Sequence, residues 1–474
     1  MKHYKFFIDG QWVDSAEKKE VINKYTGQPF ATIAQSTSED VEKAVQASKK
    51  SFEKIKLTPY KRYEILLKTS KLLLEKETEL AEILCKECGK PIGDSRIEVQ
   101  RAAQTFEIAA EEAKRIHGEM VPIEASPGSE NRLAFTIRVP VGVVCAITPF
   151  NVPLNLIAHK IAPAIAAGNT VVLKPTQETP IVAVKLVEIL LEAGLPTGHI
   201  NLLLGSGSTI GEALLQNPEI NFYSFTGSPK VGERIKQVIG LRKCTLELGS
   251  NSAVIVHKDF PDIKKAAVLC AQRSFANAGQ VCISVQRIYV HSDIYEKFLN
   301  EMKSFTETLV VGDPMDEKTN IGPMISEKEV ERIDQWVQEA LKEGAKLVAG
   351  GEKVGTRIYK PTILSDVKND MKVVCMETFA PIAIVVPYNK IEEAIEHTNN
   401  SEFGLQAGIF TSDINVAMKA AKEIETGGVI INDTSMYRAD AMPYGGVKKS
   451  GTGKEGPKYV IEEMTEEKII VFNL

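Results

Sequence analysis

Val141-Gly-Val-Val-Cys-Ala-Ile147 is a continuous apolar run, and the fold can be worked out from it. An unbroken run of this length is typical of a parallel strand that is covered on both faces. Thr170-Val-Val-Leu-Lys174 has the same character, and an amphipathic helix is expected over 181–193. Further strands are expected at 201–205 and 221–225. Strands that alternate with helices in this way predict a doubly wound parallel sheet.

The second half of the chain has the same alternation without repeating the sequence. Its expected strands and helices are 253–257, 287–290, 327–343, 382–386, 391–398 and 428–432. The predicted fold class is therefore α/β, with two doubly wound parallel-sheet domains.

The N-terminal region is predicted to begin with short strands around an Asp9-Gly10 turn and to become helical from Thr37. Thr37 and Asp40 have the spacing of a capping box. A long helix is expected from about Tyr60 to Gly89, and another from about 94 to 117.

Two extended segments fall outside the domains. Residues 119–140 are predicted to form a β-ribbon, and the chain ends in Lys468-Ile-Ile-Val-Phe-Asn-Leu474, a β-like tail. Because an unpaired terminal strand promotes aggregation, we expect this tail to add to a partner subunit's sheet. The protein is accordingly expected to be a homo-oligomer, either a dimer or a tetramer.

Composition excludes several classes of protein. The chain has 474 residues, of which 43% are hydrophobic and 25% charged, with a net charge of −5. This charge gives no basic footprint for nucleic acid, and no apolar stretch is long enough to span a membrane. Seven widely spread cysteines favour reduced thiols, so a cytoplasmic location is expected. Cys85-Lys-Glu-Cys88 has no second ligand pair nearby, and no metal site is predicted.

One cysteine stands in a loop suited to chemistry, Phe275-Ala-Asn-Ala-Gly-Gln-Val-Cys282-Ile-Ser284. Ala278 and Gly279 leave room for the chain to turn and for a substrate to approach the thiol. A single cysteine is more often a packing residue than a nucleophile, so its role depends on partners elsewhere.

Two glycine-bearing turns suit the binding of phosphate. Gly205-Ser-Gly207-Ser-Thr-Ile-Gly211 follows a strand and opens a helix, where backbone N–H groups attract negative charge. Its spacing departs by one residue from the usual dinucleotide fingerprint, which leaves an ordinary turn as the alternative. A second turn of this type lies at Phe225-Thr-Gly-Ser-Pro-Lys-Val-Gly232, and Lys174 ends a strand at the edge where such sheets bind ligands.

These stretches, in this order and spacing, resemble the aldehyde dehydrogenase superfamily along essentially the whole chain. The motifs that carry the resemblance are Pro149-Phe-Asn-Val-Pro153, Lys174-Pro-Thr-Gln177, Phe225-Thr-Gly-Ser228, Leu246-Glu-Leu-Gly249, Asn277-Ala-Gly-Gln-Val-Cys282, Glu377-Thr-Phe-Ala-Pro381 and Tyr444-Gly-Gly-Val-Lys-Lys-Ser-Gly451. Within the family, the sequence is most similar to the lactaldehyde, sulfolactaldehyde and non-phosphorylating glyceraldehyde-3-phosphate dehydrogenases. The resemblance implies a Rossmann-like coenzyme domain at 1–118 and 141–248, a catalytic domain at 249–440, and an oligomerisation arm and tail at 119–140 and 441–474.

The resemblance also implies the catalytic roles. Cys282 attacks the aldehyde to give a thiohemiacetal, hydride transfer leaves a thioester, and Glu247 activates the water that hydrolyses it. Asn151 and the Cys282 backbone N–H hold the developing alkoxide. Lys160 is expected to assist near the oxyanion and the base.

The coenzyme is expected to be NAD or NADP. The resemblance and the phosphate-binding turns assign its site to Ile147, Thr148, Phe150, Lys174, Thr176, Gln177, Gly207, Gly211, Phe225, Thr226, Gly227, Ser228, Val231, Leu248, Gly249, Glu377 and Phe379. Gln177 stands where the family commonly has a glutamate, which would grip the ribose diol and repel a 2′-phosphate. The preference between the two coenzymes is therefore open.

The substrate is expected to be a small, polar, anionic aldehyde: sulfolactaldehyde, lactaldehyde, phosphonoacetaldehyde or succinate semialdehyde. Arg101 and Arg438 are the candidate anion-binding residues, because a guanidinium binds such groups through paired hydrogen bonds. Asn155 and His159 are candidates for contact with a 2-hydroxyl, and Val281 and Ile283 flank the thiol.

Two other functions remain compatible with the sequence. A CoA-acylating relative would pass the acyl group to CoA, although Glu247 favours water as the acceptor. A catalytically silent homologue would lack part of the set Asn151, Glu247, Cys282 and Glu377, and all four are present.

Overall fold

An eight-stranded sheet organises the first α/β domain of the computed structural model, which describes residues 1–474. Its strands, in spatial order, are β24 (Gly451–Thr452), β12 (Lys243–Glu247), β11 (Phe222–Thr226), β8 (Val143–Ile147), β9 (Thr170–Lys174), β10 (Ile200–Leu202), β2 (Phe6–Ile8) and β3 (Gln11–Val13). The five strands from β12 to β10 are parallel, whereas β24 and the β2–β3 hairpin are antiparallel to their neighbours. From β8 the chain adds β9 and β10 on one side and later β11 and β12 on the other. This reversal opens a crevice at the carboxyl ends of β8 and β11.

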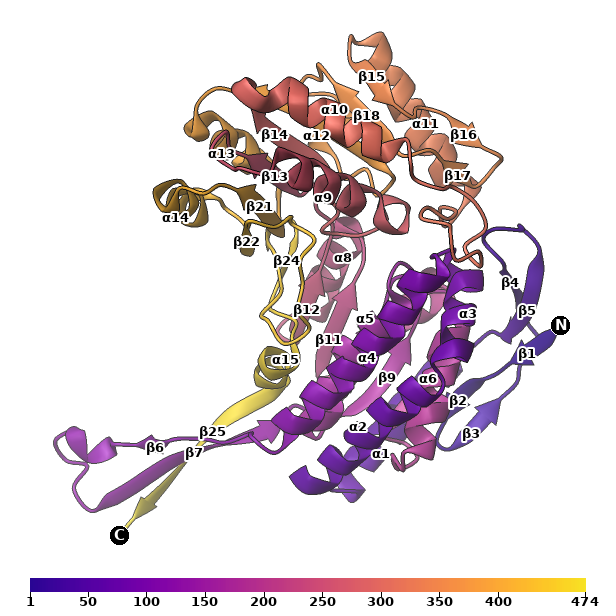
Figure 1. Cartoon of the computed structure of the whole chain (residues 1–474). Coiled ribbons are helices and arrows are strands. Elements are labelled where there is room, and N and C mark those ends of the chain that lie inside the picture. Colours follow the sequence, from indigo (N-terminus) through magenta and orange to yellow (C-terminus); the bar gives the residue numbers. More distant parts are fainter.

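Helices of the first domain pack on this sheet and on one another (Figure 1). They are α1 (Ser38–Lys54), α2 (Pro59–Glu75), α3 (Glu77–Cys88), α4 (Ile92–Ala113), α5 (Pro153–Ala167), α6 (Ile181–Glu192), α7 (Glu212–Gln216), α8 (Pro229–Ile239) and α15 (Pro457–Glu463). The Thr37–Asp40 capping box at α1 is confirmed. The single long helix expected after Tyr60 is wrong: Lys76 leaves helical geometry (φ −103°, ψ 16°) and divides it into α2 and α3. No helix breaker in the sequence marks that point.

A seven-stranded sheet forms the second domain. Its strands, in spatial order, are β15 (Lys346–Ala349), β18 (Thr362–Ser365), β19 (Ile382–Tyr388), β14 (Arg287–His291), β13 (Ala253–Val256), β21 (Gln406–Phe410) and β22 (Gly428–Ile431). Only β15 is antiparallel to its neighbour. Its helices are α9 (Ile263–Phe275), α10 (Tyr295–Thr306), α11 (Glu327–Lys342), α12 (Lys372–Cys375), α13 (Ile391–Asn399) and α14 (Ile414–Glu423). The predicted α/β class with two doubly wound parallel sheets is confirmed.

Small sheets complete the two domains. One joins β1 (Lys2–Tyr4), β5 (Pro29–Ala34) and β4 (Lys18–Ile22), and two-stranded sheets join β16 (Lys353–Val354) with β17 (Ile358–Tyr359) and β20 (Phe403–Gly404) with β23 (Val447–Lys448). Each domain has its own large apolar core. No helix combines the length and the apolar character that crossing a bilayer requires.

A β-ribbon projects from the first domain as an arm and carries the C-terminus (Figure 1). It consists of β25 (Thr465–Asn473), β7 (Arg132–Pro140) and β6 (Met120–Val121). The tail is already paired within its own chain, since β25 pairs with β7 from Thr465↔Pro140 to Asn473↔Arg132, and its addition to a partner subunit's sheet stays a prediction. The other edge of β25 has no strand beside it. Residues 451–452 lie in the first sheet, so the segment 441–474 is divided between that sheet and the arm.

Candidate active site

A strained turn after α9 presents the thiol of Cys282. Asn277, Ala278 and Gly279 all have positive φ, at 50°, 53° and 69°. Such angles are unfavourable for residues with a Cβ, so the surrounding structure must hold the turn in place. A Cβ at Gly279 would collide with the backbone carbonyl of Ala380, and only glycine fits there. The turn directs the chain into the space between the two domains just before β14.

Cys282 lies between two hollows. On one side are two adjoining hollows of about 440 Å³ and 760 Å³, which share Phe150, Glu178, Thr226, Gly227 and Ser228; together they are called here the long crevice. On the other side is a hollow of about 190 Å³, the small cavity. About six water molecules would fill the small cavity. Cys282, Asn151 and Leu156 line both the crevice and the cavity, so the thiol is open to a ligand from either side.

Asn151 is anchored so that one amide hydrogen stays available. Its side-chain Nδ2 donates to the backbone carbonyl of Gln280 at 2.9 Å. Its backbone carbonyl accepts from Asn277 Nδ2 at 3.0 Å. An amide nitrogen has two hydrogens. The second hydrogen of Nδ2 is therefore free to meet an oxygen atom on a carbon bonded to Cys282.

Glu247, at the end of β12, is a buried carboxyl group whose two oxygens have no hydrogen-bond partner. A Cβ at Gly445 would lie 2.9 Å from its Oε1, which places the carboxyl group beside the Tyr444–Gly445 turn. Burial, followed by the nearby Glu455 carboxylate, raises the pKa of Glu247 well above its ordinary value. Such a group holds a proton more readily than an ordinary glutamate does, which suits a general base or acid.

Glu455 is a second buried carboxyl group, and its pKa is shifted in the opposite direction from that of Glu247. It accepts from Lys160 Nζ at 2.9 Å and from Arg438 Nη2 at 2.9 Å. Burial raises the pKa of Glu455, but Lys160 and Arg438 outweigh it and hold the pKa at about 2. Lys160 also donates to Thr226 Oγ1 at 2.7 Å, and the β11–β12 register pairs Thr226 with Glu247. Lys160 thus lies next to Glu247, although it lines neither hollow.

Tyr444 is a residue of this site that the sequence reading did not assign. Its hydroxyl lies 3.0 Å from Cys282 Sγ, and the Arg438 guanidinium stacks on its ring at 3.8 Å from the centroid. Burial raises the pKa of the Cys282 thiol to about 11, against the lowering effects of Tyr444 and Arg438. The only signal in the sequence was a tyrosine directly before Gly445-Gly446 in a recognised motif.

Asp440 collects three of the four polar residues predicted to bind substrate. It accepts two hydrogen bonds from Arg101, at 3.0 and 2.7 Å, one from Asn155 at 3.1 Å, and lies 2.9 Å from His159 Nε2. His159 is buried, does not line the small cavity and faces Asp440 instead, so nothing in this geometry supports its expected contact with the substrate, which stays a prediction.

Arg101, Arg438, Asn155, Val281 and Ile283 do line the small cavity. Neither arginine is a free cation, however, because Asp440 binds Arg101 and Glu455 binds Arg438. Arg273, which the sequence reading did not single out, also lines the cavity, and it is exposed and has no carboxylate within ion-pair distance.

The long crevice gathers every residue predicted to bind coenzyme. Its outer part is lined by Ile147, Thr148, Phe150, Lys174, Thr176, Gln177, Gly207, Gly211, Phe225, Thr226, Gly227, Ser228 and Val231. The part next to Cys282 is lined by Leu248, Gly249, Glu377 and Phe379. Gly207–Gly211 forms a single turn of π-helix that leads into α7.

Lys174 and Glu377 are the buried charged groups of the crevice. Lys174 Nζ has one long contact, 3.5 Å to the Pro175 carbonyl, and burial lowers its pKa to about 8. Glu377 Oε1 accepts from the Ser250 N–H at 2.8 Å, and burial raises its pKa to about 7. A buried amine without a carboxylate partner at one end and a carboxylate at the other suit the phosphate and hydroxyl groups of a dinucleotide. Phe379, held at φ 46°, meets Phe150 edge-on at 5.8 Å and narrows the crevice beside Cys282.

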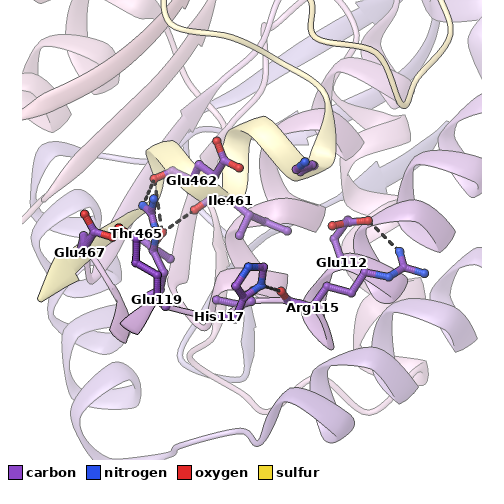
Figure 2. A pocket seen from close by; sticks show the side chains of 12 residues that line it. Glu112, Arg115, His117, Glu119, Ile461, Glu462, Thr465 and Glu467 are labelled. Carbon is purple, nitrogen blue, oxygen red and sulfur yellow. Dashed lines mark hydrogen bonds and ion pairs between the residues drawn. The ribbon is translucent and has the colours of Figure 1, made fainter. Parts of the chain in front are cut away.

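A separate groove of about 400 Å³ lies at the base of the arm, between the end of α4, α15 and β25 (Figure 2). Its charged side chains have partners within the protein: Arg115 pairs with the Glu112 carboxylate at 2.7 Å, and Arg138 donates to the backbone carbonyl of Glu462 at 3.3 Å. It contains no thiol and no buried unpaired group, and the chemistry described above is confined to the space around Cys282.

Comparison with known proteins agrees with this geometry. Residues 12–470 match the aldehyde dehydrogenase family. Because the match covers nearly the whole chain, the protein belongs to that family. It is an NAD(P)-dependent aldehyde dehydrogenase.

Three relatives place the chain within the family. It is 60% identical over 474 residues to 3-sulfolactaldehyde dehydrogenase of Priestia aryabhattai, covering 100% of this chain and 99% of the relative. The structure of aldehyde dehydrogenase 21 from Physcomitrella patens, in complex with the reaction product succinate, is 37% identical with a TM-score of 0.97, covering 100% and 99%. Glyceraldehyde-3-phosphate dehydrogenase GapN from Methanocaldococcus jannaschii, complexed with NADP, is 44% identical with a TM-score of 0.93, covering 97% and 100%. The expectation of NAD or NADP as coenzyme is confirmed.

Proposed function

We propose that the protein oxidises a small anionic aldehyde to its carboxylate through a thioester on Cys282, with 3-sulfolactaldehyde as the first candidate. The observation that carries the proposal is the position of Cys282, whose sulfur borders both the long crevice and the small cavity. An aldehyde in the cavity then meets the thiol on the side opposite to the coenzyme.

The residues of the site divide the chemistry between them. The thiol proton leaves toward Glu247, the sulfur bonds to the aldehyde carbon, and the carbonyl electron pair moves to an oxygen that Asn151 Nδ2 binds. The nicotinamide, when bound in the crevice, accepts the hydride. Glu247 passes the thiol proton to solvent, and its carboxylate then takes a proton from water as the water attacks the thioester and releases the sulfur as thiolate. The raised pKa of Glu247 supports this role, because its carboxylate accepts a proton more readily than an ordinary glutamate does.

The size and charge of the small cavity support an anionic substrate of three or four carbons. Arg273 has no carboxylate partner, and Arg101 binds Asp440 through Nε and Nη2 only, so its Nη1 is free. Asp94 also lines the cavity; burial raises its pKa, and Lys90 and Arg273 act in the opposite direction. Relatives of matching length are a 3-sulfolactaldehyde dehydrogenase and an enzyme crystallised with succinate, and both names refer to anions. Lactaldehyde, phosphonoacetaldehyde and succinate semialdehyde are the competing candidates.

For the coenzyme, we propose that the crevice accepts both NAD and NADP. Gln177 presents an amide in place of a carboxylate, with its Oε1 accepting from Lys19 Nζ at 3.1 Å. The neighbouring Glu178 is paired with Lys24 at 2.7 Å, and Lys174 stays without a partner. No unpaired carboxylate is therefore present beside Gln177 to repel a 2′-phosphate.

For the assembly, we propose a homo-oligomer in which the arm contacts a second copy. The arm leaves large apolar side chains exposed, and β25 has one unpaired edge. These side chains are Met120, Leu133, Ile137, Ile469, Val471 and Phe472. Light scattering of the full chain and of a Val471→Lys variant tests this: the wild type is expected as a dimer or tetramer, and a monomeric wild type rejects it.

The function is tested by kcat/KM for the four candidate aldehydes with each coenzyme, with and without CoA. We expect 3-sulfolactaldehyde to give the highest value, free acid as the product, and no turnover by Cys282→Ala. An acyl-CoA product would indicate the CoA-acylating alternative, and absence of any reduced coenzyme would indicate a silent homologue.

The anion site is tested with Arg273→Ala and Arg101→Ala, using Arg96→Ala as the matched control, since Arg96 lies on α4 and pairs with the exposed Glu317. We expect KM for anionic aldehydes to rise about tenfold or more in the first two variants, because each loses one charge-assisted hydrogen bond to the substrate. KM should be unchanged in the control. An unchanged KM in both would reject the anion-binding role.

A further inference from the structure

The hydroxyl of Tyr444 has one hydrogen-bond partner in the protein, and it is the sulfur of the nucleophile. The Oη–Sγ distance is 3.0 Å, and the tyrosine is 3% exposed. A buried phenol normally finds a partner for its O–H group, and a backbone carbonyl or a carboxylate is the common choice. Here the phenol faces Cys282 instead, at the border of the small cavity.

We propose that Tyr444 donates its phenolic hydrogen to the sulfur of Cys282 and so holds the nucleophile, as the thiolate, between the long crevice and the small cavity. This inference rests on the proposed role of Cys282 as the nucleophile. It adds a residue that contacts the reacting atom to the set formed by Asn151 and Glu247.

The backbone of Tyr444 is fixed independently of the thiol. Its N–H donates to the Glu455 carbonyl at 3.1 Å, and the Glu455 N–H donates back to the Tyr444 carbonyl. The side chain of Glu455 is in turn held by Lys160 and Arg438. The hydroxyl is thus positioned before any substrate binds, and no reorganisation is needed to form the contact.

The ring of Tyr444 is fixed as well. Ile283 and Leu405 pack against it, and the Arg438 guanidinium lies 3.8 Å from the ring centroid. A cation above a phenol ring is attracted to its electrons, and it makes the O–H group a better donor. Arg438 therefore acts on the sulfur twice, through space and through the tyrosine.

Four charged or titratable groups face the Cys282 sulfur, and their effects differ. Tyr444 and Arg438 lower the pKa of the thiol, whereas the Glu247 and Glu377 carboxylates raise it. Tyr444 is the one that contacts the sulfur. Burial keeps the pKa of Tyr444 itself well above the ordinary tyrosine value, so the phenol still carries its proton when the thiolate forms.

The hydrogen bond changes in strength as the reaction proceeds, without transfer of the proton. When the sulfur electron pair forms the bond to carbon, the sulfur loses its charge and the contact with Tyr444 weakens. When the thioester is hydrolysed, the C–S bond breaks, the electron pair returns to sulfur, and the contact strengthens again. Tyr444 therefore favours formation of the thiolate before attack and its departure afterwards.

The test is the pH dependence of Cys282 alkylation by iodoacetamide in the coenzyme-free enzyme, wild type against Tyr444→Phe. This variant removes one oxygen atom and keeps the ring under Arg438. We expect the midpoint of the profile to rise by about one pH unit and alkylation at pH 8 to slow about tenfold, which is the effect of one hydrogen bond to a charged group. KM for the aldehyde is expected to change little. Tyr459→Phe is the matched control, with a profile expected to equal that of the wild type.

A second measurement avoids any effect of substitution on folding. In the wild-type chain labelled with 3-fluorotyrosine, the phenol is more acidic and donates more strongly, so the alkylation midpoint is expected to fall. Identical midpoints for the wild type, Tyr444→Phe and the labelled enzyme would overturn the inference. That result leaves the proposed function standing as long as Cys282→Ala is inactive, whereas turnover by Cys282→Ala would reject the proposed function itself.

Discussion

The long crevice and the small cavity meet at Cys282, but their walls are built differently. The crevice is walled largely by backbone turns such as Gly207–Gly211 and Gly227-Ser228, and the charge of its Lys174 has no partner. The cavity is walled by side chains, and several of their charges are already paired within the protein, as in Arg101–Asp440 and Arg438–Glu455, whereas Arg273 is unpaired. A turn tolerates changes in the side chains around it, whereas removing one partner of a buried pair leaves the other charge unpaired. The cavity should therefore be the more sensitive of the two regions.

Glu247 and Glu455 show the same contrast between an unpaired group and a paired group. Both are buried, and each perturbs the other's ionisation. Glu455 is fully paired and serves the structure, while Glu247 has no partner and is available for proton transfer. Neighbouring carboxyl groups with pKa values driven apart are the usual arrangement for separate roles.

The largest effect is expected for Glu247→Gln. Loss of a general base lowers kcat by about 10²- to 10⁴-fold. Because neither oxygen of Glu247 has a hydrogen-bond partner, the amide replaces it without unpairing another group, and the melting temperature should hold or rise. Steady-state kinetics and thermal unfolding check both statements. A marked fall in melting temperature would mean that Glu247, like Glu455, stabilises the fold, and the proposed difference between the two carboxyl groups would be wrong.

Glu455→Gln is expected to act mainly through stability. It leaves Lys160 and Arg438 without their carboxylate in a buried site, which costs about 3–5 kcal/mol. The melting temperature should fall by several degrees, and activity should fall with it because Lys160 and Arg438, which stacks on Tyr444, lose their carboxylate partner. Glu462→Gln, on the exposed face of α15, is the control. If Glu455→Gln and Glu462→Gln unfold at the same temperature, the buried network of Glu455, Lys160 and Arg438 contributes little to stability.

The sequence predicted the long crevice better than the small cavity, and the reason lies in how each is built. The crevice follows from local patterns: apolar runs such as Val141–Ile147 locate the strands, and glycine turns at their ends locate the ligand edge. The wall of the cavity depends on Asp440 and Glu455, which reach helices α4 and α5 from positions about three hundred residues away, and on Tyr444, which reaches Cys282 from 162 residues away. No local pattern encodes such pairs. β21 was likewise missed as a strand, because Gln406 and Gly408 are poor strand formers, and burial between β13 and β22 overrides that preference.

The pH dependence of the wild-type enzyme tests the environment shared by both regions. Burial raises the pKa of the Cys282 thiol to about 11 and that of Glu247 well above its ordinary value, so both groups lose their protons at a higher pH than an ordinary cysteine and glutamate do. Each unit of pH below the thiol pKa costs about a factor of ten in thiolate. We expect kcat/KM to increase from pH 6 to pH 9, by up to about tenfold per unit. A profile already flat at pH 6 would mean that the thiol is ionised in the resting enzyme.

The smallest effect is expected for Gln177→Glu, which changes the wall of the crevice. The new carboxylate stands near Lys19 and Lys174, so part of its charge is offset and the fold should be unaffected. Repulsion of a 2′-phosphate should still weaken NADP binding by about tenfold, the effect of roughly one like charge, while NAD binding holds or tightens. Equilibrium titration of the two coenzymes, followed by protein fluorescence, gives the ratio, and Gln28→Glu on an exposed turn is the control. Equal changes for NAD and NADP would mean that Gln177 does not face the 2′ position, and the tolerance of the crevice would then have to come from Lys174 and the glycine turns.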